Sequence, residues 1–369
     1  MKIGMVDIKR QYQNIKDDID LAVHRVLDSG QFILGPDVAT LESEVARYLD
    51  IKYTVGVASG TDALHLALLA CGVGSGDEVI TTPFTFIATC EAINYCGAVP
   101  VFVDVDPRTY NVDPKKIEEK ITKKTKAIIP VHMYGQASEM ESILETARKY
   151  GLKVIEDVAQ AFGGEYRNKK LGTLGDVGCT SFFPSKNLGA YGDGGMVFTH
   201  DEDVAKKIKM LRVHGSREKY VHDLIGFNSR LDTLQAAIVR VKLKYIDQWN
   251  NMRIKHAEQQ YNKLLSDCDI VTPYVESFNK HVYHLYTILV DDRKKCQKFL
   301  NSRGIATAIH YPIPVHLQKS FEYLGLSSED LPVSNEISQK TLSLPMFPEL
   351  KEEEIDHVVK AVKEFLQSS

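Results

Sequence analysis

A lone lysine, Lys186, stands at a chemically unusual place in the stretch SFFPSKNLGAYGDGGMV, residues 181–197. It follows an apolar, aromatic run that is typical of a strand, and it precedes a glycine-rich turn. A lysine amine that is removed from water has a lowered pKa and can form a Schiff base with a carbonyl group. The alternative is a surface lysine whose aliphatic stem covers apolar neighbours. Lys186 is therefore a candidate for reaction inside a cleft, provided that other residues support it.

Two further segments carry residues that could act with that lysine. Residues 58–68, ASGTDALHLAL, run from a strand through Gly60 into a helix that begins at Thr61–Asp62. The N–H groups at a helix start suit a phosphate, although Ser, Thr and Asp are also ordinary helix caps. In KVIEDVAQAFGG, Glu156 and Asp157 end a strand, so their side chains point to opposite faces and only one can enter a cleft. That acid could pair with a cofactor's ring nitrogen, hold a metal ion or cap the next helix.

The other motifs of the chain narrow the chemistry. The histidines form neither an H-x₃-H nor an HExxH pattern, so we expect no metal site. His132 follows a predicted strand, and a hydrogen-bonded structural role competes with a functional one for it. Neither GxGxxG after the first strand nor GxxxxGK[ST] is present, which argues against a dinucleotide or nucleoside triphosphate site.

Strands and helices that alternate along the chain must position these residues. Strands are predicted at residues 54–59, 78–81, 99–105, 126–133, 153–157, 178–183 and 194–199. Helical periodicity is found between them, at residues 61–72, 85–97, 114–121 and 138–151. This alternation predicts an α/β fold with a mostly parallel, seven-stranded sheet and helices on both faces. Ligands of such sheets bind beyond the carboxyl ends of the strands, where Gly60, Asp157 and Lys186 stand.

The C-terminal third has a different character. A long amphipathic stretch at residues 231–265 predicts a connecting helix, which we expect to be broken near Trp249. After it, a strand-like run, a charged helix around 291–303 and a final helix at 351–367 predict a small α+β domain. We therefore divide the chain into a large domain and a small one. The large domain covers residues 1–245, with an N-terminal arm and helix at 1–30, and the small domain covers residues 246–369.

The composition is that of an ordinary globular protein. The chain has 369 residues, of which 44% are hydrophobic and 25% charged, and its formal net charge is −4. This charge argues against nucleic-acid binding. No apolar run approaches the roughly 18 residues of a membrane span, and the first twenty residues lack a signal peptide's apolar core. Six cysteines without CxxC pairing predict reduced core thiols in a cytoplasmic protein.

A phosphate-type loop, an aromatic in TPFTF, an acid and a lysine follow one another along the predicted strands. In this order they resemble the large domain of a fold-type I (aspartate aminotransferase-like) pyridoxal phosphate enzyme. Three segments narrow the resemblance: SGTDALHLALLA, EDVAQAFGGEYRNKKLGTLGDVGCTSFFPSKNLGAYGDGGMV and GFNSRLDTLQAAI. They closely resemble the sugar aminotransferases of the DegT/DnrJ/EryC1/StrS family, and the similarity extends over essentially the whole chain.

The resemblance implies roles around the ring of pyridoxal 5'-phosphate. Lys186 would form the internal aldimine and later move a proton between the cofactor and the sugar carbons, with pyridoxamine phosphate in the second half-reaction. Asp157 would pair with the ring nitrogen and keep it protonated, which makes the ring an electron sink. Gln160 would contact the 3-oxygen of the ring. Phe86, in TPFTF, would stack on the ring face, where its alternative role is core packing.

The resemblance also implies a phosphate site that two subunits share. Gly60, Thr61 and Ser181 would hold the cofactor phosphate. Asn228, in GFNSRLD, matches an asparagine that the family supplies from the neighbouring subunit. The active site would then be composite, a homodimer would be the minimal working unit, and the loop at residues 216–230 would cross the interface.

Substrate contacts follow from two loops of the same resemblance. The loop HYPIPVHLQ, residues 310–318, would extend from the small domain toward the sugar, and its two prolines would stiffen it. Its hydrogen-bonding side chains are His310, Tyr311 and His316. A rigid surface connection is the alternative for this loop. Arg217 and Tyr220 would approach the nucleotide diphosphate from the partner subunit, where the phosphate charge favours cations.

The local sequences favour one substrate among several. FNSRL stands where enzymes that aminate C-4 more often have YNYRM, so the chain resembles more closely the enzymes that aminate C-3 of dTDP-3-oxo-6-deoxyhexoses. The resemblance implies glutamate as the amino donor. The alternatives are a UDP-linked 3-keto sugar acid and a dTDP-linked 4-keto-6-deoxy sugar. A dehydration enzyme of this family would lack Lys186, and a regulatory or binding protein on the same fold would not need the complete cofactor set.

Overall fold

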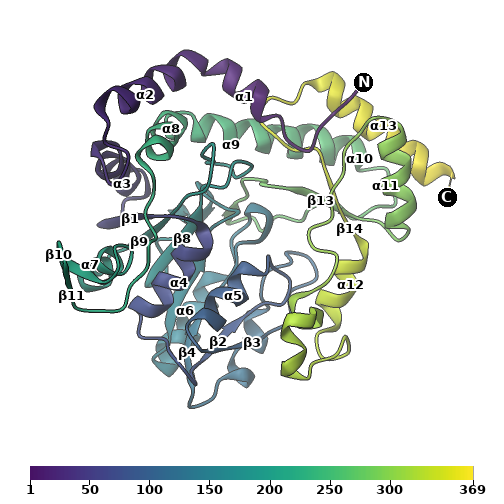
Figure 1. Cartoon of the computed structure of the whole chain (residues 1–369). Helices are drawn as coiled ribbons and strands as arrows, with labels where there is room; N and C mark the ends of the chain where they lie inside the picture. Colours follow the sequence, from purple (N-terminus) through teal and green to yellow (C-terminus); the bar gives the residue numbers. More distant parts are fainter. Residues whose placement is uncertain (369) are drawn as a thin grey trace.

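A sheet of seven strands forms the centre of the computed structural model, which describes residues 1–368 (Figure 1). In spatial order the strands are β1 Tyr53–Val57, β9 Gly195–Thr199, β8 Val177–Ser181, β5 Lys153–Asp157, β4 Thr125–Ile128, β2 Glu78–Thr81 and β3 Val99–Phe102. The five strands from β8 to β3 run parallel, and β9 is antiparallel to both of its neighbours. The predicted mostly parallel, seven-stranded α/β sheet is confirmed.

Two of the strands, β4 and β3, end at least three residues before the end that the sequence pattern predicts. The pattern extends to residue 133 for β4, but this strand ends at Ile128. Ile129 still donates to the carbonyl of Ile80, and Pro130 then has no N–H with which to continue the ladder. The pattern extends to residue 105 for β3, which ends at Phe102. The chain beyond both strands is therefore free to form the edge of a site.

Helices cover both faces of the sheet. On one face lie α4 Gly60–Ala70, α5 Ala88–Tyr95 and α7 Glu202–Leu211, and on the other α3 Pro36–Leu49, α6 Met140–Tyr150 and α8 Thr233–Leu243. Alternate residues of each strand face alternate layers, as in β9, where Val197 packs on the α4 side and Met196 on the α3 side. The central helix α4 is buried from Ala63 to Leu68, where apolar residues occupy both of its sides.

The predicted helix at residues 114–121 is wrong. The structure forms two short 3₁₀ turns there, η1 Pro114–Lys116 and η2 Glu118–Lys120. Only Ile117 is fully buried in this segment, while the lysines and glutamates around it are largely exposed. Ile121 is only partly buried. One fully buried apolar side chain in eight residues does not offset the entropy of ordering a helix, so the backbone forms isolated turns.

The predicted connecting helix is broken earlier than expected. α8 ends at Leu243, and α9 Ile246–Ile254 begins after a break at Lys244 and Tyr245, four residues before Trp249. Trp249 lies inside α9, where it is buried and stacks on Tyr245 with ring centroids 5.6 Å apart. The helix continues through the π-helical turn η4 Lys255–Asn262 into α10 Lys263–Leu265. Trp249 thus anchors the helix and does not interrupt it.

The N-terminal segment connects two parts of the molecule. Helices α1 Ile8–Asn14 and α2 Lys16–Ser29 run along the outside of α8 and α9 (Figure 1). Ile19 and Val26 of α2 pack with Ile238 of α8 in one apolar cluster. Ile3, ahead of these helices, pairs with Ile305 and belongs to the core of the C-terminal part. The first residues therefore join the C-terminal core, while α2 covers the large sheet domain.

The C-terminal part has the predicted α+β character. β13 Tyr286–Leu289 pairs antiparallel with β14 Thr341–Leu344, and α11 Arg293–Ser302 and α13 Glu352–Ser368 pack beside them. The connection between α11 and β14 contains η5 Val315–Leu317, η6 Lys319–Leu324 and α12 Pro332–Lys340. Val315 and Phe321 of this connection pack on Phe102 of the large sheet. The division at residues 245 and 246 stays a prediction.

Two small sheets complete the fold. β6 Glu165–Tyr166, β7 Lys169–Lys170 and β12 Asn279–Lys280 form one, and β10 Ser216–Glu218 and β11 Val221–His222 form an exposed hairpin. None of the helices within residues 1–368 is both long and apolar enough to span a bilayer. The same residues hold no group of three or more His, Cys, Asp or Glu side chains that could bind a metal ion.

Candidate active site

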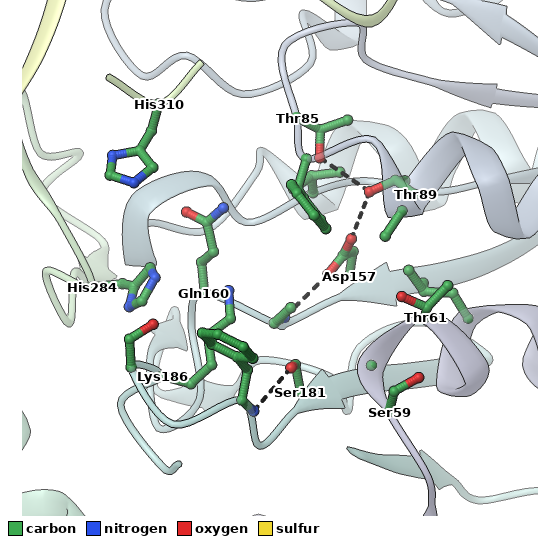
Figure 2. A pocket seen from close by; sticks show the side chains of 18 of the residues that line it. Ser59, Thr61, Thr85, Thr89, Asp157, Gln160, Ser181, Lys186, His284 and His310 are labelled. Carbon is green, nitrogen blue, oxygen red and sulfur yellow. Dashed lines mark hydrogen bonds between the residues drawn. The ribbon is translucent and has the colours of Figure 1, made fainter. Parts of the chain in front are cut away.

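A cavity of about 440 Å³ opens at the carboxyl ends of the parallel strands (Figure 2). Its walls come from segments far apart in the sequence, so the fold has to assemble it. The predicted site residues that line it are Gly60, Thr61, Phe86, Asp157, Gln160, Ser181, Lys186, His310 and Tyr311. Thus the structure brings nine of the thirteen predicted residues into one cavity of the size that small-molecule sites usually have.

Lys186 enters this cavity from the turn that follows β8. Its N–H donates to the carbonyl of Phe183 at 2.9 Å. Phe182, the residue after β8, is fully buried, and its N–H donates to the carbonyl of Gly194 at 2.8 Å. Burial lowers the pKa of the Lys186 amine to about 8, and the negative charge of Asp157 opposes that shift. A substantial fraction of the amine is therefore neutral near physiological pH, as a nucleophilic lysine requires.

Asp157 faces the cavity from the end of β5, with both carboxylate oxygens held. Oδ1 accepts from the Ala159 N–H at 3.1 Å, and Oδ2 accepts from the Thr89 hydroxyl at 2.9 Å. Thr85 lies 3.0 Å from Thr89, and because the Thr89 proton goes to the carboxylate, Thr85 donates to Thr89 (Figure 2). Burial raises the pKa of Asp157, while these hydrogen bonds and the charge of Lys186 lower it.

Glu156 points to the other side of β5, as the alternation of the strand predicts. Its carboxylate is fully buried and accepts from the backbone N–H groups of Gly172, Leu174 and Gly175 at 2.7–2.9 Å. His132 completes the set at 3.0 Å; because its Nδ1 accepts from the Ser138 N–H, its Nε2 carries the proton that Glu156 receives. Glu156 and His132 therefore fasten β5 to its neighbouring loops, and of the two acids only Asp157 enters the cavity.

The start of α4 forms one wall, with backbone N–H groups that have no acceptor inside the helix. Ser59 caps this helix by accepting from the Asp62 N–H at 3.1 Å. Gly60 is required here, because a Cβ on it would lie 2.6 Å from the Cβ of Ser181, at the end of β8. Gly195 of β9 is required similarly, since its Cβ would lie 2.3 Å from the Ser59 carbonyl oxygen. Small residues thus let α4 approach the strand ends closely and leave a cradle suited to an anion.

Gln160 and Tyr311 are joined on the opposite wall. The Gln160 Oε1 accepts from the Tyr134 N–H at 3.0 Å, which directs its Nε2 toward the Tyr311 hydroxyl at 3.2 Å. Phe86 is 53% exposed although it lies in the cavity wall, and its ring centroid is 5.9 Å from that of Tyr311. An aromatic ring with one open face fits the predicted stacking role of Phe86 better than core packing.

The expected sugar contact from His316 needs correction. η5 turns His316 away from the cavity into an apolar cluster that includes Phe102, whose ring centroid is 6.2 Å from that of the histidine. The residue is 1% exposed and does not line the cavity. Its neighbour in the same loop, His310, does line the cavity, where its Nδ1 is 2.9 Å from the Ser343 hydroxyl.

Three predicted residues lie on the exposed loop and hairpin at residues 216–230. Arg217 pairs with Asp223 of the same hairpin at 3.4 Å, Tyr220 is 83% exposed, and Asn228 is exposed as well. None of the three lines the cavity of its own chain. Their expected roles concern a partner's site, so they stay predictions.

Several residues that line this cavity are not among the predicted site residues. Phe183 is half-exposed in its wall, and Thr85, Thr89 and His284 line it as well. The two threonines flank the aromatic in TPFTFIAT at a spacing of four, which places them on one side of the start of a helix. That spacing was a usable signal. His284 gave none, because it stands inside an apolar strand-like run.

The lowered pKa of Lys186 predicts a particular pH profile for its reaction with pyridoxal 5'-phosphate. Only the neutral amine attacks an aldehyde, so the initial rate of attachment should rise with pH and level off above about 8, and not near the ordinary 10.5. The adduct would be trapped by borohydride and located by peptide mass spectrometry, with Lys186→Ala as the control. A midpoint near 10 would contradict the desolvation of this amine.

Comparisons with known proteins agree with this geometry. A model of the DegT/DnrJ/EryC1/StrS aminotransferase family matches residues 13–363. The chain is 49% identical to the pleiotropic regulatory protein of Geobacillus stearothermophilus over 99% of both chains. It is 47% identical to the UDP-2-acetamido-2-deoxy-3-oxo-D-glucuronate aminotransferase of Pseudomonas aeruginosa, over 94% of this chain and 96% of the other. It is 45% identical to the dTDP-3-amino-3,6-dideoxy-alpha-D-galactopyranose transaminase of Aneurinibacillus thermoaerophilus, over 98% and 99%.

Solved structures show the same fold over the whole chain. DesV of S. venezuelae, in complex with a ketimine intermediate, is 40% identical, with a TM-score of 0.97 over 99% of both chains. NtdA of Bacillus subtilis, with bound cofactor PMP, is 35% identical, with a TM-score of 0.90 over 99% of this chain and 85% of the other. The family model covers nearly all of the sequence, and these identities extend over 85% or more of each relative. The chain therefore belongs to the DegT/DnrJ/EryC1/StrS aminotransferase family.

Proposed function

We propose that this protein is a pyridoxal phosphate-dependent aminotransferase that converts the C-3 keto group of a nucleotide-linked sugar into an amine, with glutamate as donor. One observation carries the proposal: a desolvated lysine and a buried carboxylate face one cavity, between an anion cradle and an open aromatic ring. These are the groups that a pyridine ring with a phosphate and an aldehyde needs around it. The cofactor PMP in the solved Bacillus subtilis relative supports the same assignment.

The residues of the cavity fit that cofactor group by group. The first N–H groups of α4, with Thr61 and Ser181, provide donors for the phosphate, and the helix dipole adds positive potential there. Asp157 can accept a proton-bearing ring nitrogen, since both of its present donors leave lone pairs on its oxygens. The Gln160 Nε2 is a donor for a ring oxygen, and Phe86 has a free face for stacking.

The chain's own groups supply binding and proton transfer. Bound pyridoxal phosphate supplies an electron sink for negative charge that develops at a substrate carbon. Asp157 keeps the proton on the ring nitrogen, and Thr89 holds the carboxylate in the orientation for that role. Lys186, with its pKa near 8, can accept and return a proton at neutral pH. Asp157 is buried and Lys186 is half-buried, so the protein shields much of both groups from water.

Two features bear on the substrate. The names of the Pseudomonas and Aneurinibacillus relatives place the oxo or amino group at C-3 of a UDP-linked and a dTDP-linked sugar respectively, so C-3 is common to both. Lys186 is the only lysine or arginine among the residues of the described chain that line the cavity, and Phe183 presents an apolar ring there. This wall favours the methyl group of a 6-deoxyhexose over the carboxylate of a sugar acid. We therefore propose a dTDP-3-oxo-6-deoxyhexose as substrate, with the UDP-linked 3-oxo sugar acid as the second candidate.

A substrate panel tests the proposed function. The purified protein would be incubated with glutamate and with dTDP- and UDP-linked 3-keto and 4-keto sugars, and NMR would identify the aminated carbon. We expect amination at C-3 of the dTDP-linked 6-deoxy sugar. Amination of the UDP-linked sugar acid alone would replace the first candidate by the second. A protein that takes up no cofactor and aminates no sugar would point to a regulatory or binding role.

Substitutions of the two neighbouring acids of β5 should affect different properties of the protein. Asp157→Asn should reduce turnover by at least about 100-fold, because the ring nitrogen is no longer kept protonated. Glu156→Gln should retain most of the turnover but lower the free energy of unfolding by about 2 kcal/mol or more, since its NH₂ group meets two of the four donors. Urea denaturation and steady-state kinetics measure the two effects. Equal losses of turnover in both variants would refute the separation of roles.

We further propose a homodimer with composite sites, in which Asn228 contacts the partner's cofactor phosphate. The segment around it exposes apolar residues that a second subunit would cover, among them Ile225, which is 92% exposed. Ser229 donates to Asp62 of α4 at 2.6 Å and accepts from the Ala58 N–H, which ties this segment to the anion cradle of its own chain. The interface and the phosphate site would therefore be adjacent.

Mixing two inactive variants tests this geometry. Asn228→Asp should weaken cofactor binding by at least about 10-fold, because a negative charge replaces a hydrogen-bonding amide beside a phosphate. Combined with Lys186→Ala chains, it gives heterodimers in which one site carries both lesions and the other carries neither. Subunit exchange should then restore up to half of the wild-type activity in each heterodimer. Exchange without recovery would place Asn228 in its own chain's site.

A further inference from the structure

His284 lines the cavity, yet the proposed function gives it no role. It follows β12 at the start of the C-terminal part, and it is 8% exposed. Its ring lies on the same side of the cavity as Lys186 and His310 (Figure 2). A buried imidazole in a cavity wall acts as a hydrogen-bond donor or as an acceptor according to which ring nitrogen carries the proton. The surroundings of His284 determine that choice.

A directed chain of hydrogen bonds fixes the proton on Nδ1. The chain begins at the carbonyl of Phe162, which can only accept, so the amide of Asn250 donates to it through Nδ2 at 3.1 Å. The Asn250 Oδ1 is then an acceptor and receives the Nδ2 of Asn187 at 2.8 Å. Asn187 Nδ2 also donates to the carbonyl of Val282 at 3.1 Å, which confirms its orientation.

Asn187 consequently presents its Oδ1 to His284. This oxygen lies 3.2 Å from Nδ1 of His284 and cannot donate, so Nδ1 carries the proton. Nε2 of a neutral imidazole with a proton on Nδ1 is a bare acceptor. No hydrogen bond joins Nε2 to another residue of the described chain, and the residue lines the cavity, which leaves its lone pair for a group inside the site.

The neighbouring backbone leaves room for this series of hydrogen bonds and holds its ends in place. Gly163 adopts a φ of +83°, and a Cβ there would lie 2.6 Å from the Nδ2 of Asn250. Arg253, one turn after Asn250 on α9, donates to the carbonyls of His284 and Met346. A single helix therefore holds both the amide chain and the backbone of His284.

The charges that face His284 also disfavour its protonation. Burial lowers the pKa of His284 well below its ordinary range, and the positive groups Lys186 and Arg253, together with His310, lower it further. The neutral ring with a bare Nε2 thus persists over the pH range in which the Lys186 amine titrates.

We propose that His284 is a further residue of the active site, whose Nε2 accepts a hydrogen bond from the Lys186 amine when that amine is not bonded to the cofactor. The inference rests on the proposed function. An amine removed from water needs acceptors for its N–H groups, and the acceptor capacity that Asp157 has left is the capacity that the proposed function assigns to the ring nitrogen. The flexible lysine stem lets Nζ reach His284, and Asn187, the residue next to Lys186, fixes the distance between the two attachment points.

The tautomer can be tested on the wild-type protein without any activity. Long-range ¹H–¹⁵N spectra of the full chain with ¹⁵N-labelled histidine distinguish protonated from bare ring nitrogens, and the signals of His284 are those that vanish in His284→Asn. We expect a proton on Nδ1 and a bare Nε2 at pH 7, unchanged at pH 6. A proton on Nε2, or an imidazolium at pH 7, would overturn the inference.

The contact with Lys186 is tested by a matched pair of variants. Asn at position 284 keeps a donor near Nδ1 but loses the acceptor, whereas Gln places an amide oxygen near the position of Nε2. Competitive acetylation with acetic anhydride, read by peptide mass spectrometry, gives the titration midpoint of each lysine. The acetylation would be done on the full chain twice, once with bound pyridoxamine 5'-phosphate and once without it. Pyridoxamine 5'-phosphate has no aldehyde and therefore leaves Lys186 free. Exposed Lys169 serves as the internal control.

Loss of the acceptor should lower the Lys186 midpoint, because a hydrogen bond to the ammonium stabilises the charged form. We expect a decrease of about one pH unit in His284→Asn and a value close to wild type in His284→Gln, with Lys169 unchanged. Equal midpoints for Lys186 in all three proteins would overturn the inference and leave the proposed function intact. Failure of the wild type to attach pyridoxal phosphate at Lys186 would instead contradict the proposed function.

Discussion

The removal of the Lys186 amine from water is the constraint on which the rest of the site depends. Burial of an amine is unfavourable unless other groups compensate, and here it lowers the pKa to about 8. The fold meets this requirement with the carboxylate of Asp157, placed at the end of the adjacent strand β5. The carboxyl ends of parallel strands lie at one edge of the sheet. The Lys186 amine, the Asp157 carboxylate and the start of α4 therefore lie close together without a long loop.

Helix α9 extends this constraint to the C-terminal part of the molecule. Asn250 holds Asn187, the residue after the reactive lysine, and Arg253 holds the carbonyls of Tyr283 and His284. The position of Lys186 and the entry of the chain into the C-terminal core are thus set by neighbouring turns of one helix. The break at Lys244 and Tyr245 separates α9 from α8, and α9 contacts both segments through Asn250 and Arg253.

Features set by neighbouring residues could be predicted from the sequence, whereas features set by contacts between distant residues could not. Local β-branched runs predicted all seven strands, and the period of two residues predicted that only one of Glu156 and Asp157 enters the cavity. The family resemblance, and not the alternation, selected Asp157. The helix at 114–121 failed for lack of buried anchors, which a short periodic pattern does not reveal. The expected sugar contact of His316 was wrong because this residue lies in a 3₁₀ turn that directs its side chain away from the cavity. The bond from Thr89 to Asp157 joins residues 68 positions apart, and no local pattern records it.

The two acids at the end of β5 show what separates a structural carboxylate from a functional one. Both are buried, so burial alone does not distinguish them. Glu156 accepts four hydrogen bonds, which fill the four lone-pair sites of a carboxylate and leave nothing for a ligand. Asp157 accepts two, which is enough to orient it but leaves half of its capacity facing the cavity. The unfilled capacity of a buried, oriented group, and not its shifted pKa, therefore marks the functional residue, and the bare Nε2 of His284 meets the same criterion.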